Sequence, residues 1–118
     1  MRTRMADKKN PLKLNALQCK TLVIMQALAH IPQASERNAQ GEATIHTLPD
    51  PHGNHYHVGN AVVHGRDMAG LYMKPVWNAL ERKGLARANW PNEITLTRAG
   101  IAYDTGIAEQ VLHASRGH

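Results

Sequence analysis

The sequence predicts one α+β domain that is mainly helical. The chain has 118 residues, which is the size of a single domain. Apolar residues recur at helical spacing within residues 14–30 and 68–83. Residues 85–96 contain two short strand-like segments around a turn rich in Asn and Pro, which predicts a β-hairpin. We expect residues 14–114 to form the domain and residues 1–13 to form a basic, flexible tail.

The composition is basic, with 14 Lys and Arg against 9 Asp and Glu, a net charge of +5 when histidine is neutral. A pI of about 9.7 is typical of nucleic-acid-binding domains and favours a polyanionic partner. The single cysteine, Cys19, cannot form an internal disulfide and is expected to be a small core residue. No apolar run is long enough for a membrane span, and the basic start lacks a signal-peptide core, so we expect a cytoplasmic protein.

The first predicted helix covers residues 14–30. Asn15 is a suitable N-cap, and Pro32 prevents the helix from continuing. Its apolar residues extend well beyond one stripe, which predicts burial on more than one side, either centrally in the domain or partly in a dimer contact.

The middle of the chain gives weaker signals. Residues 32–43 are polar and predict a loop. The segments Ala43–Leu48 and His55–Val58 flank a turn dense in Pro, Asp, Gly and Asn, which predicts two strands, with a long loop and one strand as the alternative. Residues 59–66 are a candidate short helix that ends at Gly65.

The clearest amphipathic stripe lies within residues 68–83, where Met73, Val76, Trp77 and Leu80 are expected to face inward. Pro75 is compatible with this helix only if regular helix begins near residues 71–74, because proline is tolerated in a first turn. After the hairpin at residues 85–96, Thr97 is expected to cap a last helix from about Arg98 to Ala114. Gly100 and Gly106 weaken this helix and can break it.

Residues 76–100, VWNALERKGLARANWPNEITLTRAG, carry a specific resemblance. LERKGL followed by a short basic hairpin and ITLTRAG resembles the end of a recognition helix, a wing and the entry to a dimerising helix in winged helix-turn-helix proteins, such as MarR-like and PadR-like bacterial regulators. The resemblance implies a homodimeric transcriptional regulator that binds double-stranded DNA. This sequence departs from the pattern at Pro75 and in an extra hairpin or long loop between the first and second helices.

The resemblance implies DNA contacts from four places. They are the outward face of the recognition helix, the turn before it, the wing and the start of the last helix. Lysine binds phosphate or guanine, asparagine can pair with adenine, and a wing arginine suits the minor groove. The candidates are Arg66, Tyr72, Lys74, Asn78, Arg82, Arg87, Trp90 and Arg98. Each has a structural alternative: helix charges can be merely solvated, Trp90 can fold back on the domain, and Arg87 can pair with Glu93 across the hairpin.

Histidines form the second cluster. Strand alternation puts His55 and His57 on one face, and His46 on the expected facing strand could join them. Three imidazoles in that arrangement suit zinc or nickel, whereas solvated histidines are the simpler interpretation. Two alternative functions follow: a winged-helix adaptor that binds protein rather than DNA, or a metal-responsive regulator. The sequence has no phosphate-binding glycine loop, no nucleophile elbow and no close carboxylate pair, so we expect no enzyme and no required cofactor.

Overall fold

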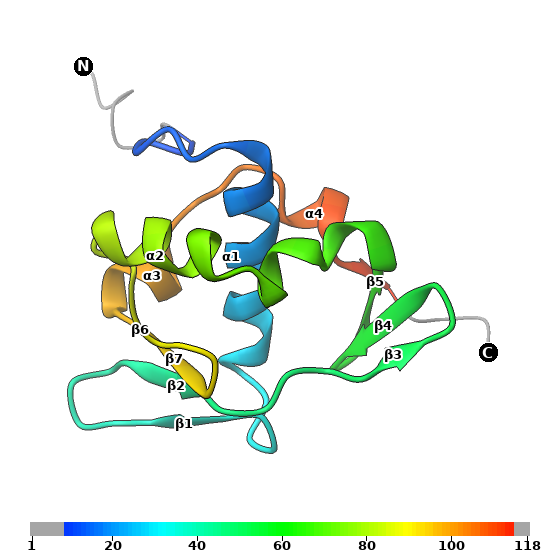
Figure 1. The fold of residues 1–118 in the computed structure, drawn as a ribbon, viewed down its shortest axis with the longest axis horizontal. Helices are drawn as coiled ribbons and strands as arrows, with labels where there is room; N and C mark the ends of the chain where they lie inside the picture. The colour runs from blue at the N-terminus through cyan, green and yellow to red at the C-terminus, as the bar shows by residue number, and fades with distance from the viewer. Residues whose placement is uncertain (1–8, 115–118) are drawn as a thin grey trace.

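A computed structural model describes residues 9–114, which fold into an α+β structure around a central helix, α1 (Figure 1). Two antiparallel sheets lie on different sides of α1. Strands cover nearly as much of this part of the chain as α-helices do, so the expectation of a mainly helical domain is wrong. The elements in chain order are α1 (Ala16–Leu28), β1 (Ser35–Arg37), β2 (Ala43–Ile45), β3 (Pro51–His52), β4 (His55–Val58), β5 (Ala61–His64), the 3-10 helices η2 (Gly65–Asp67) and η3 (Ala69–Tyr72), α2 (Lys74–Arg82), β6 (Ala86–Asn89), β7 (Glu93–Leu96), α3 (Arg98–Ala102), α4 (Ala108–Val111) and β8 (His113–Ala114).

Helix α1 confirms the prediction for the first helix. Asn15 is its N-cap, and Asn15 and Gln18 form a reciprocal capping box that satisfies two backbone N–H groups at the helix start. Most of the helix is buried, as its broad apolar surface predicts, and Cys19 lies in the core with its thiol pKa raised by burial. Gln26 donates its side-chain N–H to the carbonyls of Gly100 and Tyr103 at 3.0 and 2.8 Å, which ties α1 to α3.

The first sheet has the strand order β1-β2-β7-β6. The hairpin predicted at residues 85–96 is confirmed as β6 and β7. Strand β2 pairs with β7, placing Ile45 opposite Ile94 and Ala43 opposite Leu96, and these four side chains are buried. The other face of the sheet is polar. There the hydroxyls of Thr44 and Thr95 share a 2.8 Å hydrogen bond.

The second sheet has the order β3-β4-β5-β8, and it corrects two expectations. The expected pairing of residues 43–48 with 55–58 is wrong, because β2 pairs with β1 and β7 whereas β4 pairs with β3 and β5. The expected helix at residues 59–66 is also wrong. Gly59 and Asn60 form a two-residue turn, with Gly59 at φ +61°, and β5 returns along β4. Glycine at the first position of such a turn is a hairpin signal that outweighs the short apolar run.

The helix expected over residues 68–83 is shorter than that range. Residues 69–72 form the 3-10 helix η3, and regular α-helix begins at Lys74 with Pro75 in its first turn, as the proline requires. Val76, Trp77 and Leu80 are buried as predicted. Met73 is not. It precedes the helix in extended conformation and is 39% exposed, so its expected inward position is wrong.

The last expected helix is broken into α3 and α4, and the chain then adds β8 to the second sheet. Thr97 caps α3 as predicted, accepting a hydrogen bond from the Gly100 N–H. Of the expected flexible tail, residues 1–8 lie outside the described part of the chain. Residues 9–13 are anchored to the segment after α3, because the Asn10 N–H donates to the Asp104 carbonyl and the Leu12 N–H donates to the Tyr103 hydroxyl.

Candidate nucleic-acid interface

Helix α2 has one buried face and one polar face. Val76, Trp77, Ala79 and Leu80 are buried. Lys74, Asn78 and Arg82 follow one another at four-residue spacing, so they lie along a single stripe, with Asn78 half-buried and the two cations exposed. In Figure 1 the helix crosses in front of α1. The stripe therefore places two exposed cations and an amide on one side of a helix whose other side is buried in the core.

Trp77 fixes α2 to the rest of the domain. Its side chain is 1% exposed, and its indole N–H donates to the Leu71 carbonyl at 3.0 Å, which joins α2 to η3. The ring of Trp90, from the turn between β6 and β7, packs edge-on against Trp77 with ring centroids 4.7 Å apart. Trp90 is half-buried in this contact. It therefore folds back on the domain, which is the alternative to a DNA contact that the sequence left open, and it stabilises the hairpin against α2.

The 3-10 helix η2 places Arg66 in an exposed position ahead of α2. The next residue, Asp67, is buried and forms an ion pair with Lys20 of α1 at 3.0 Å. One side of this short turn is therefore held by α1 while the Arg66 side chain extends into solvent.

Arg87 lies on the polar face of the first sheet and is held by a carboxylate. Its guanidinium makes two hydrogen bonds of 2.7 and 2.8 Å to Glu42, which comes from the loop between β1 and β2. The alternative of a pairing with Glu93 is wrong, because the register places Arg87 opposite Thr95 and Glu93 opposite Asn89. The loop also holds Glu42 in place, since the Asn38 side chain accepts from the Glu42 N–H and donates to its carboxylate.

This ion pair predicts a pH effect. The hydrogen bonds from Arg87 and then Asn38 lower the pKa of Glu42 from 4.5 to about 2. A carboxyl group whose pKa is lowered on folding stabilises the folded state above its unfolded pKa, and that contribution is lost as the pH falls towards 2.

In an NMR titration of the side-chain carboxyl, we expect Glu42 to titrate near pH 2 in the unmodified protein and much closer to 4.5 in Arg87→Gln. Arg82→Gln, which removes a cation outside the pair, should leave the midpoint unchanged. A Glu42 midpoint near 4.5 in the unmodified protein would contradict the ion pair.

The remaining two candidates are Tyr72, the last residue of η3, and Arg98, the first residue of α3. The Tyr72 hydroxyl donates to the Pro49 carbonyl at 3.1 Å, and its partial burial, with Tyr56 and Asp50 nearby, raises its pKa to about 12. Arg98, at the start of α3, is exposed and packs its side chain against Gly41, where an added Cβ would lie 3.4 Å from its Cγ. Arg98 therefore lies near the Arg87–Glu42 pair.

The proposed metal ligands are not brought together. His46 follows β2, donates its backbone N–H to the Ala34 carbonyl and shares a hydrogen bond with Thr47. It therefore lies at the end of a strand of the first sheet, whereas His55 and His57 lie on β4 of the second sheet. Strand pairing instead places His64 and His113 on the face that carries His55 and His57. Within residues 9–114, no group of three or more His, Cys, Asp or Glu side chains is arranged to hold a metal ion. The pairing on which the three-histidine site depended is wrong.

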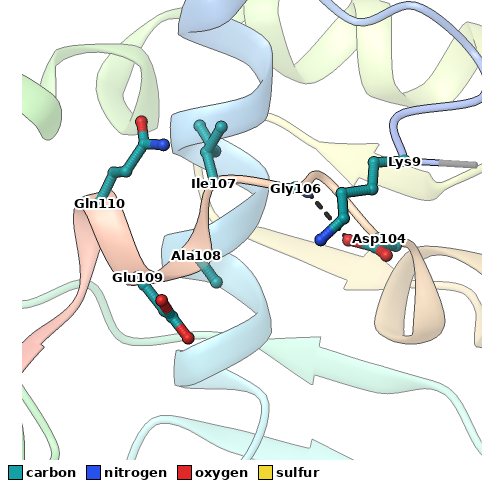
Figure 2. A pocket seen from close by; sticks show the side chains of 7 residues that line it. All are labelled: Lys9, Asp104, Gly106, Ile107, Ala108, Glu109 and Gln110. Atoms are coloured by element: carbon teal, nitrogen blue, oxygen red, sulfur yellow. Dashed lines mark hydrogen bonds between the residues drawn. The ribbon is translucent and has the colours of Figure 1, made fainter.

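A pocket of about 250 Å³ lies between the start of the described chain and α4 (Figure 2). Lys9 and Asp104 face one another there, and the Gly106 N–H donates to the Asp104 carboxylate. In Figure 2 the side chains of Glu109 and Gln110 diverge from one another on opposite sides of the α4 turn. The charged residues that line the pocket are Lys9, Asp104 and Glu109.

Two residues of the candidate interface are not found from the sequence. The apolar stripe predicts Met73 on the buried face, although Pro75 in the first turn signals that regular helix starts after Met73. No sequence signal joins Glu42 to Arg87, which is 45 residues away.

No family model, curated protein or solved structure matches this chain. Among the helices of residues 9–114, none is both long and apolar enough to cross a membrane.

Proposed function

We propose that this protein binds double-stranded DNA through α2, as a winged helix-turn-helix protein with an inserted sheet. The supporting topology is the order α1, β2, η2–η3, α2, β6, β7, in which β2 joins the β6–β7 hairpin by pairing with β7. That order provides a first helix, a short strand, a compact second helical segment, a recognition helix and a two-stranded wing. The strands β3, β4 and β5 are inserted between β2 and η2.

The observation that carries the proposal is the stripe on α2. A recognition helix buries one face and offers the other to the major groove, with its N-terminal residues nearest the base edges. Lys74 is at that end, Asn78 is one turn further on, and Arg82 follows at the C-terminal end. Lysine and arginine suit phosphates or guanine, and asparagine suits adenine. Arg66 lies ahead of the helix, where it can meet the phosphate backbone.

The wing contributes less than the sequence resemblance implies. Arg87 is engaged by Glu42, and Trp90 packs on Trp77, so neither side chain is available without breaking a contact. We therefore assign the main role to Lys74, Asn78 and Arg82. The extension to a homodimeric transcriptional regulator in the cytoplasm rests on the resemblance of residues 76–100 alone.

Fluorescence anisotropy with a labelled duplex of random sequence, measured over a series of salt concentrations, tests the proposal. Affinity should fall steeply with salt, because bound cations release counterions from the phosphates. The double variant Lys74→Ala/Arg82→Ala should bind about 10- to 100-fold more weakly and show a log–log salt slope that is smaller by about 2.

Arg37→Gln is the control for charge away from α2. It removes one positive charge, whereas the double variant removes two. Arg37 lies on β1, at the opposite edge of the first sheet from β6, the strand next to α2. This variant should keep nearly full affinity. An equal loss of binding free energy per charge removed in the control and the double variant would show that net charge alone drives binding, and it would contradict a recognition surface on α2.

A protein-binding adaptor is the second candidate. The observation that favours it is the polar face of the first sheet, where Glu42 neutralises Arg87 and the carboxylates Glu36 and Glu93 share the face. A protein with no affinity for duplex DNA even at low salt would exclude the first proposal and leave the adaptor.

A further inference from the structure

Two exposed apolar side chains precede the recognition helix. Among the large apolar residues of the described chain, those with exposure above one third are Leu12, Tyr72 and Met73, at 38%, 43% and 39%. Tyr72 and Met73 are adjacent and come directly before Lys74, the first residue of α2. Leu12 lies near the other end of α2, where the Lys83 ammonium group donates to its carbonyl. The apolar pair is thus specific to the N-terminal end of the helix.

Met73 occupies a position that usually serves helix stability. It is the N-cap of α2, where Ser, Thr, Asn or Asp would accept a hydrogen bond from a free backbone N–H. Methionine makes no such bond, and its side chain is left in solvent. An exposed apolar side chain at a cap position adds little to the fold, so Met73 is available for a contact outside the chain.

Tyr72 lies next to Met73 and is also partly exposed. Its hydroxyl is fixed to the Pro49 carbonyl, so the ring is held against the linker between β2 and β3 while nearly half of the side chain stays exposed. Methionine beside it is unbranched and polarisable, and it adapts to an irregular apolar surface. The pair therefore combines one fixed ring with one adaptable side chain, flanked by the cation of Lys74.

We propose that Met73 and Tyr72 contact the 5-methyl groups of thymines in the major groove, so that the protein prefers A·T-containing sites. The proposal rests on DNA binding through α2. The N-terminal residues of a recognition helix are those that reach base edges, and the thymine methyl group is the apolar feature that the major groove displays. Lys74 keeps the apolar pair close to the duplex through a phosphate.

Replacing thymine by uracil tests this contact directly, because it removes the methyl group and leaves the phosphates and the hydrogen-bonding edges unchanged. We compare alternating A·T and A·U duplexes of about two helical turns. The unmodified protein should bind the thymine duplex more tightly, by about fourfold for each methyl group covered. Met73→Gln, which keeps the side-chain length, should lose most of this difference, and Met73→Leu should keep it.

Leu12→Ala is the matched control, since it removes an exposed apolar side chain at the other end of α2, and it should retain the full preference for thymine. Circular dichroism establishes that each variant is folded. Equal affinity of the unmodified protein for both duplexes would overturn the methyl contact while leaving DNA binding in place. A preference that persists unchanged in Met73→Gln would overturn the contact assigned to Met73. Absence of binding to either duplex at low salt would instead contradict the proposed function itself.

Discussion

Trp77→Ala should lower the free energy of unfolding by about 3–5 kcal/mol, as truncation of a fully buried tryptophan usually does. The substitution leaves a cavity between α2 and the hairpin, removes the ring on which Trp90 packs, and leaves the Leu71 carbonyl without its indole partner. Urea unfolding followed by circular dichroism measures the loss. Because α2 would also lose its attachment to η3, the DNA affinity that we propose for this helix should fall together with stability.

Trp77→Phe separates packing from hydrogen bonding. Phenylalanine retains much of the ring but has no N–H for the Leu71 carbonyl, so we expect a smaller loss of about 1–2 kcal/mol. A loss below about 1 kcal/mol for Trp77→Ala would mean that this residue is not the anchor of α2.

Gly100→Ala should destabilise the protein by about 3 kcal/mol, although helix propensity alone predicts a gain of about 1 kcal/mol. The added Cβ at Gly100 would lie 2.0 Å from the Leu85 carbonyl oxygen. That oxygen belongs to the backbone and also accepts the Thr97 N–H at 3.1 Å, so it cannot move without disturbing the start of α3. Thermal and urea unfolding both report the difference.

Gly84→Ala is the comparison for this glycine. Gly84 has φ +78° but no atom within 4 Å of an added Cβ, so its cost comes from backbone conformation alone and should be about 1 kcal/mol. A stabilising effect of Gly100→Ala would show that helix propensity outweighs the close approach of α3 to the Leu85 carbonyl.

The sequence predicts the structural role of Trp77 but not that of Gly100. The apolar stripe that contains Trp77 is visible in the sequence, and its burial is confirmed. Gly100 appears in the sequence only as a weak helix former. This position cannot hold a side chain because the carbonyl of Leu85, 15 residues earlier in the chain, lies where a Cβ would be. Propensity describes a residue in its own helix and contains no information about such an approach.

The second sheet shows the same difference on a larger scale. The sequence predicts a turn over residues 49–54, whereas the structure has strand β3 at Pro51–His52 and a turn only at Gly53 and Asn54. The predicted strand partners are also wrong. Alternation within a strand establishes which side chains share a face, whereas the neighbouring strand depends on the whole sheet. For that reason the sequence predicts a group of His46, His55 and His57 and leaves out His64, which faces His55 in the structure.

By itself, the sequence determined the elements that depend on short-range chemistry. They are α1 with its Asn15 cap, the start of α2 before Pro75, the β6–β7 hairpin and the cap at Thr97. Only the tertiary structure decided which strands pair, that Glu42 engages Arg87, and that Met73 is exposed at the start of α2. The physical reason is range: caps, turns and proline act within a few residues, whereas ion pairs, sheet partners and burial depend on segments that meet only when the chain folds.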